Sequence, residues 1–271
     1  MKQKWTILWS LVLSALLLVA LTSATLAWFT SSLNVGTDRV TARTGTNALE
    51  LQISQEGGDR FTPQHNGEIG EIPLKVSEHP LIPISTVDLQ TFLYCPYTDN
   101  DIGTTFLPVP DDTYYYHDTI YLRAEAEGMT EAGKINLYLD NTSVPIVQDF
   151  SGELLTAARL GLTFDGGNPV ILSLSDVNNG DGNTSLNGSL LATGQVLTLS
   201  GGTVTAAADP AISLAQAQYG SGTPLTTMEM NRIYAVDIYF YLEGCDPDCL
   251  TNRVAMDEAY LNLAFFGLLA D

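Results

Sequence analysis

The histidines are the first residues to consider for catalysis, because this 271-residue chain has only three of them. His65, His79 and His117 stand in unrelated contexts. The chain has no His-Glu-x-x-His pair to hold zinc, no Gly-x-Ser-x-Gly elbow and no phosphate-cradling glycine loop. Isolated histidines are usually ordinary surface or packing residues. We therefore predict no catalytic residue and expect that the protein is not an enzyme.

A cation site is the second chemistry that the sequence offers. Asp176, Asn178 and Asp181 alternate with other residues around Gly180, and carboxylate and amide oxygens around a glycine turn can wrap Ca²⁺. The set is incomplete, because Gly180 stands where a third oxygen ligand belongs and Asn187 stands where a glutamate would close the loop. Ca²⁺ bound here is one reading, and a plain Asn/Gly turn is the other. We expect no other cofactor.

The cysteines give the third candidate. Cys245 and Cys249 flank Asp246–Asp248, a spacing that closes a small ring by a disulfide if the turn brings their Cα atoms within reach. A pair of free thiols is the alternative. In a further reading, Glu243 and the two aspartates of this turn gather a metal. Cys95 is the odd one of the three cysteines, and we expect it to be buried.

Strands must position all of these side chains, because period-two alternation is the dominant pattern. Along Tyr234–Glu243, apolar and polar residues fall on opposite sides of an extended chain. The same alternation recurs over Leu49–Ser54, Ile120–Glu127, Ile135–Leu139, Leu160–Phe164 and Leu261–Phe265. The one helical segment, Ser151–Ala158, leads directly into a strand. With turn signals between the runs, the pattern predicts an all-β fold, an antiparallel sandwich or jelly roll.

Two further regions have a distinct composition. Residues 165–224 are rich in Gly, Asn, Ser and Thr, with weak strand character at 170–174 and 195–199, and we expect inserted surface loops and edge strands. The aromatic residues Tyr114–Tyr116, with the outward-facing Tyr239 and Tyr241, either form a platform for a sugar or pack across strands.

The N-terminus predicts export. Lys2 and Lys4 precede an apolar run from Trp5 to Leu21, and small residues follow. This order is that of a signal peptide over residues 1–27, with Thr25 and Ala27 read by the peptidase and the mature chain starting at Trp28. An uncleaved anchor is the alternative, and it would be the chain's only link to a membrane.

The mature chain, residues 28–271, is expected to form a single domain outside the cell. Cleavage would leave 31 acidic against 9 basic side chains. Such a charge favours solubility and repels the phosphate backbone, so we expect no nucleic acid as a partner. Its length is enough for one sizeable hydrophobic core.

The junction Ala24-Thr25-Leu26-Ala27-Trp28-Phe29-Thr30 resembles the export signal of the TasA and camelysin group of Gram-positive proteins, which a SipW-type signal peptidase processes. Leu154–Gly166 and Tyr239–Cys249 also resemble members of this group. The resemblance implies a jelly-roll-like subunit of extracellular fibres in a biofilm matrix, in which an N-terminal strand of one subunit completes the sheet of the next. The donor would be Trp28 to about Val40, through the side chains of Phe29, Leu33, Val35 and Val40.

We therefore expect a secreted or cell-surface structural protein that associates with itself and is processed by an export signal peptidase. The alternative is an adhesin-like surface module that binds a glycan or a host ligand. Camelysin-like proteins have also been described as metalloproteases, but the sequence carries no metal-binding catalytic motif, and that activity is the least supported reading.

Overall fold

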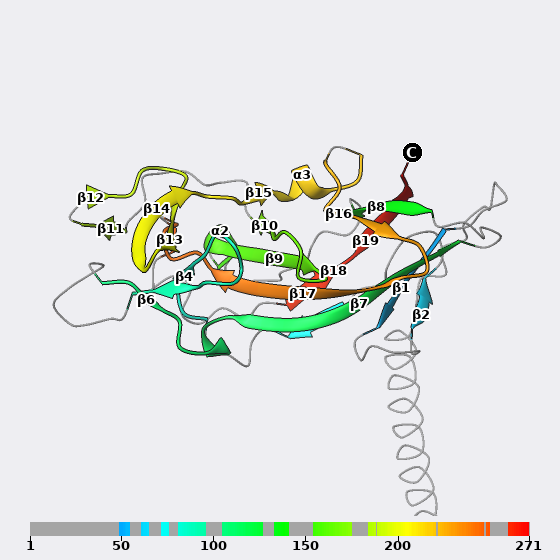
Figure 1. Ribbon diagram of the computed structural model, residues 1–271, viewed down its shortest axis with the longest axis horizontal. Helices are drawn as coiled ribbons and strands as arrows, with labels where there is room; N and C mark the ends of the chain where they lie inside the picture. Colours follow the sequence, from blue (N-terminus) through cyan, green and yellow to red (C-terminus); the bar gives the residue numbers. More distant parts are fainter. Residues whose placement is uncertain are drawn as a thin grey trace, which may run out of the picture. The chain divides into compact units, whose positions relative to one another are not determined.

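A computed structural model describes residues 49–54, 61–64, 72–75, 81–95, 105–126, 133–140, 154–174, 184–187, 189–220, 222–246, 248–249 and 260–270. All of them belong to a compact unit spanning Gly45–Asp271. Most of the described elements are strands, and the prediction of an all-β protein is confirmed (Figure 1). The helices in this part of the chain have four residues or fewer, and none is long enough to cross a membrane.

The main sheet has seven strands. Their order across the sheet is β15 (Ile212–Ser213), β10 (Val170–Ser173), β9 (Ala158–Phe164), β17 (Ile233–Leu242), β7 (Tyr116–Ala126), β1 (Leu49–Ser54) and β2 (Thr62–Gln64). All neighbours are antiparallel except β10 and β15. The long strand predicted from Tyr234 onward is β17. The predicted helix is the short α2 (Leu154–Ala157), which runs into β9 as expected.

Smaller sheets accompany the main one. A three-stranded sheet has the order β16 (Thr226–Glu229), β8 (Lys134–Leu139), β19 (Phe265–Leu269), and another has the order β4 (Ile84–Ser85), β5 (Leu93–Tyr94), β6 (Leu107–Pro108). Three strand pairs complete the set: β18 (Tyr260–Leu263) with β3 (Ile72–Lys75), β13 (Gln195–Ser200) with β14 (Thr203–Ala208), and β11 (Ser185–Leu186) with β12 (Ser189–Leu190). Two short helices, η3 (Asp112–Tyr114) and α3 (Leu214–Ala217), lie in the connections.

One hydrophobic core joins the seven-stranded and the three-stranded sheets. Alternate residues of β17 and β7 point into it, and Ile238 and Ile120 are fully buried there. Ile135 of β8 and Phe265 of β19 belong to the same cluster and are also fully buried. Close approach is needed at Gly267, because a Cβ there would lie 3.1 Å from the Leu51 side chain of β1. Burial of each such aliphatic side chain contributes about 1.5–3 kcal/mol, so this shared core is the main source of stability.

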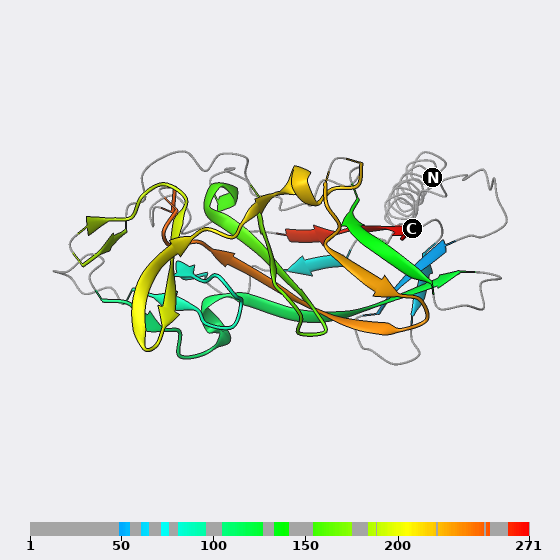
Figure 2. The ribbon, with the colours of Figure 1, turned by 45° about the horizontal axis from the view of Figure 1, so that its top comes forward.

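The region 165–224 holds more regular structure than loops alone. β10 and β15 extend the main sheet, as the weak strand signal near residue 170 suggested, and β13 and β14 form a hairpin. This hairpin packs beside β4 and β5 (Figure 2). The sequence therefore predicted the strands β10 and β13, but β10 is not an edge strand, because the unpredicted β15 lies beyond it in the sheet.

The opposite face of the main sheet is covered at one end by the segment that carries β4 and β5. Leu89 adopts a left-handed backbone with φ of 55°. The Thr86 hydroxyl accepts the Leu89 amide hydrogen at 3.1 Å, which holds this turn. The Leu89 side chain fills the space over Gly161, where an added Cβ would lie 2.6 Å from both Leu89 Cδ atoms. Glycine at position 161 thus allows the segment to dock on β9.

Candidate functional site: a buried charge cluster

The most unusual polar feature of the described residues is a fully buried arginine. Arg159 lies in β9 on the face away from the main core, and 1% of it is exposed. Its Nη2 donates to Asp246 Oδ2 at 2.8 Å and lies 3.6 Å from Asp209 Oδ2. Its Nη1 donates to the Ala158 carbonyl oxygen at 3.2 Å, and its Nε has no hydrogen-bond partner among the described residues.

Glu243 is the second buried charge of this cluster. It follows β17, is 2% exposed, and its Oε1 accepts the Cys245 amide hydrogen at 3.0 Å. Ser85 of β4 also donates to its carboxylate. Burial raises the pKa of Glu243 to about 7, against the opposing effects of Arg159 and of these two donors. Asp209 adds to the upward shift because it is a like charge.

Strand register explains why these groups meet. Arg159 pairs with Tyr241 across β9 and β17, so both side chains lie on the same face of the sheet, and Glu243 follows two residues later on that face. The turn after Glu243 returns Asp246 to the guanidinium, and Asp209 arrives from the end of β14. Separate segments of the chain therefore converge on one arginine.

The charges do not balance within the cluster. One guanidinium faces three carboxylates, those of Asp209, Glu243 and Asp246. Burial alone would lower the pKa of Arg159, but these carboxylates more than offset it and the pKa is raised. Burial, followed by the charge of Glu243, raises the pKa of Tyr241 well above its usual value. The cluster therefore holds Arg159 charged and Tyr241 neutral.

Of the two alternatives for Cys245 and Cys249, the structure has the pair of free thiols, and the disulfide is not formed. The reason is packing: Cys245 lies in a cluster with Leu93 and Leu197, whereas Cys249 lies in the main core. Burial, followed by the charge of Glu243, raises the pKa of Cys245, and the same causes raise the pKa of Cys249 to about 12. Neutral buried thiols are poor nucleophiles and poor metal ligands.

A metal at this turn also finds no support in the part of the chain that the structure describes. No three His, Cys, Asp or Glu side chains there are arranged so that they could hold a metal ion. Asp246 is instead paired with Arg159, and its Oδ1 accepts the Asp248 amide hydrogen at 3.0 Å. Cys95, which the sequence predicts to be buried, is half-buried.

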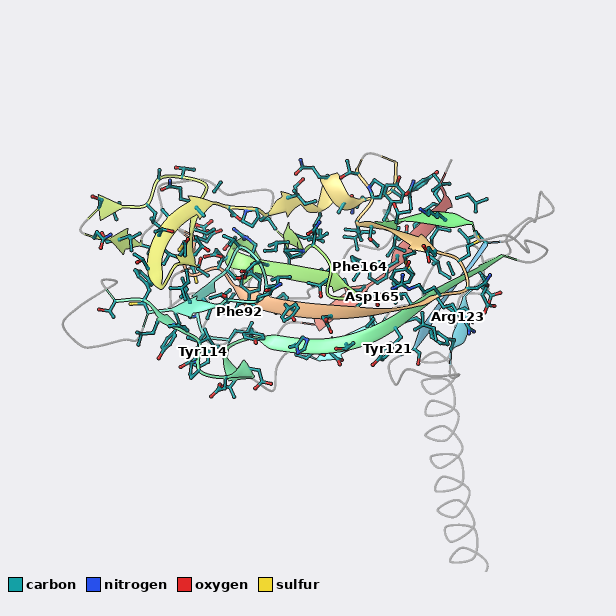
Figure 3. The ribbon with its side chains drawn as sticks, in the orientation of Figure 1. Phe92, Tyr114, Tyr121, Arg123, Phe164 and Asp165 are labelled. Atoms are coloured by element: carbon teal, nitrogen blue, oxygen red, sulfur yellow. The ribbon has the colours of Figure 1, made fainter. Side chains whose placement is uncertain are left out.

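Of the two alternatives for the aromatic residues, a sugar platform or cross-strand packing, the structure shows a packed cluster. Tyr241 is 1% exposed, because the segment carrying β4 and β5 covers it, so its prediction as an outward-facing residue was wrong. Tyr115 stacks on Phe92 at 4.4 Å, and His117 stacks on Tyr239 at 4.5 Å between ring centroids. Figure 3 shows Phe92 near the Tyr114 end of this face. These rings cover one another, which is the cross-strand packing weighed as the alternative.

Polar side chains that the sequence did not predict to interact form hydrogen bonds and ion pairs on the uncovered part of the sheet face that carries Arg159. Asp237 accepts hydrogen bonds from the hydroxyls of Thr119 at 2.7 Å and Thr163 at 3.2 Å, on the strands at either side. His117 Nε2 lies 3.7 Å from the same carboxylate. Farther along β7, Arg123, labelled in Figure 3, donates two hydrogen bonds to Gln52 Oε1 of β1 and forms an ion pair with Glu125 of its own strand. These contacts tie neighbouring strands together.

The remaining predicted site residues lie outside the described part of the chain. These are the cleavage residues Thr25, Ala27 and Trp28, the donor residues Phe29, Leu33, Val35 and Val40, the cation candidates Asp176, Asn178 and Asp181, and the histidines His65 and His79.

Comparison of the chain with models of known protein families, with curated proteins and with solved structures finds no match. The function must therefore be argued from the residues themselves.

Proposed function

We propose that this protein is an exported structural subunit of the cell surface or extracellular matrix. In this proposal the seven-stranded and three-stranded sheets pack as a jelly-roll-like sandwich. The N-terminal strand of one copy, beginning at Trp28, adds to a sheet edge of the next copy and so builds a fibre.

The observation that carries this proposal is the three-stranded sheet. Among the described residues, β16 and β19 each pair only with β8, which leaves one edge of each without a described partner. β19 contains no charge and no proline, the features that usually protect an edge, and its Leu268 and Leu269 are 42% and 40% exposed. Such an edge is suited to accept a strand.

The buried cluster fits a structural role better than a catalytic one. Arg159, Glu243 and Asp246 are each 3% exposed or less, so a substrate has no access to them in the folded state. These charged side chains therefore interact with one another inside the protein and not with a ligand. The strongly acidic balance, 31 acidic against 11 basic side chains, is typical of a protein kept soluble until it assembles.

Electron microscopy of purified residues 28–271 tests the proposal. We expect filaments, and we expect their loss when residues 28–40 are deleted, a deletion that removes no residue of the compact unit beginning at Gly45. Changing Phe29, Leu33 and Val35 to serine should have the same effect, whereas Thr30→Ser, as a matched control, should not. A protein that stays monomeric at all salt concentrations and pH values would contradict the fibre.

A further inference from the structure

Glu243 stands at a junction between the main sheet and two segments that pack on it. Ile84 of β4 forms a parallel bridge with Glu243, and the Ile84 carbonyl oxygen accepts the Gly244 amide hydrogen at 2.8 Å. Ser85 joins the same junction to the β13–β14 hairpin, because its hydroxyl oxygen accepts the Leu197 amide hydrogen at 2.9 Å. One polar contact that joins β4 to the main sheet and one that joins the hairpin to β4 therefore lie close to one carboxyl group.

Three packed elements present a polar or charged group to that carboxyl. Arg159 faces it from β9, Asp209 from the end of β14 and Ser85 from β4. Its own strand and turn add Tyr241, Cys245, Cys249 and Asp246. The Thr184 hydroxyl donates to the neighbouring Gly244 carbonyl oxygen at 3.1 Å. Arg159 is the one cation of this set.

The charge balance of the cluster depends on one proton. With Glu243 protonated, the guanidinium of Arg159 faces two aspartates; with Glu243 ionised, it faces three carboxylates in a site almost closed to water. Buried like charges without enough counter-charge are strongly unfavourable. Opening the junction to water relieves this cost, because it hydrates the carboxylate.

We propose that Glu243 is the proton-sensitive element of a latch that holds the β4–β5 segment and the β13–β14 hairpin on the main sheet. The latch is closed when Glu243 is protonated and loosens when Glu243 is ionised. Because burial raises the pKa of Glu243 from its usual 4.5 to about 7, the closed state is favoured fully below pH 4.5. This preference is lost as the pH rises to about 7. An acidic environment therefore tightens the body of the protein and a neutral one loosens it.

Hydrogen exchange of the full mature chain, read by mass spectrometry, tests the latch. The readouts are peptides covering residues 81–95 and 193–208, and a peptide covering β7 is the internal reference. Comparison with Glu243→Gln at each pH cancels the intrinsic pH dependence of exchange. Between pH 5 and pH 8 we expect the exchange rate of the two latch peptides, relative to this variant, to rise more than tenfold. The reference peptide should not change.

Two further variants keep the test decisive. Glu229→Gln removes a carboxylate whose side chain is 55% exposed and should behave as the unmodified protein does. Ser85→Ala removes a donor that favours ionised Glu243, so it should move the transition to higher pH. The proposal is wrong if the exchange rates of the two latch peptides have the same pH dependence in the unmodified protein and in Glu243→Gln. It is also wrong if the exchange rates of the latch and reference peptides change together.

Discussion

Replacing Arg159 by methionine tests whether the buried cluster is held by its one cation. Methionine keeps the apolar stem of the side chain but removes the guanidinium that lies 2.8 Å from Asp246. Asp246 and Glu243, which are 3% and 2% exposed, are then buried without a counter-charge. Removal of one partner from a buried ion pair costs about 3–5 kcal/mol.

Glu243 limits this cost, because its carboxylate can take up a proton when the arginine is absent. The loss should therefore approach about 5 kcal/mol near pH 8 and become smaller on acidification, as Glu243 is protonated. At about 2–4 °C per kcal/mol for a body of this size, Tm should fall by roughly 6–20 °C. Asp246→Asn in the Arg159→Met background should recover part of the loss, because it removes one uncompensated charge.

Urea denaturation at several pH values, followed by tyrosine fluorescence or circular dichroism, measures these free energies. Arg232→Met is the matched control: its side chain is 53% exposed and pairs with Asp165 at 2.7 Å, so it should cost only about 0–1 kcal/mol. If Arg159→Met costs no more than this control, or if its cost does not change with pH, the cluster is not an electrostatic unit and the reasoning fails.

Three further predictions follow from the packing and the titration of the same region. Gly161→Ala should destabilise the fold by about 1–3 kcal/mol in urea denaturation, because the added Cβ would clash with Leu89. The loss of stability should nearly vanish in a Leu89→Ala background, and an equal loss in both backgrounds would contradict the docking. Cys245 and Cys249 should react with a thiol reagent at least about a hundredfold more slowly in the native than in the urea-unfolded protein, because both are buried and their pKa values are raised. Fast labelling of the native protein would show instead that the thiols are accessible. The stability difference between the unmodified protein and Glu243→Gln should shift by about 3 kcal/mol in favour of the variant as the pH rises from 4.5 to above 7, and a difference independent of pH would show that the Glu243 carboxyl is not shifted.

Much of the fold follows from local pattern, because strands such as β17 and β8 bury mainly alternate residues. The alternation around Ile238 and that around Leu137 predicted β17 and β8, and the turn signals between the runs separated them correctly. The pattern does not specify which strands are neighbours. The pairing of β17 with both β7 and β9 joins segments far apart in the sequence.

The cluster could not be predicted, for a related reason. Arg159 stands in a strand whose seven residues are all buried, and a single arginine in such a run gives no signal of its partners. Asp209 and Asp246 follow it by fifty residues or more, within turns rich in small and acidic residues. The wrong prediction that Tyr241 faces solvent has the same origin, because alternation shows which face of the sheet a side chain is on but not what covers that face. Leu89 supplies that cover through a left-handed turn at a non-glycine residue.

Binding of a synthetic peptide with the sequence of residues 28–40 to the protein that lacks them tests strand donation most directly. We expect saturable binding in isothermal titration calorimetry, and we expect a scrambled peptide of the same composition not to bind. If the two peptides behave alike, donation by this segment is wrong, and the exposed edges of the sheets must serve another purpose.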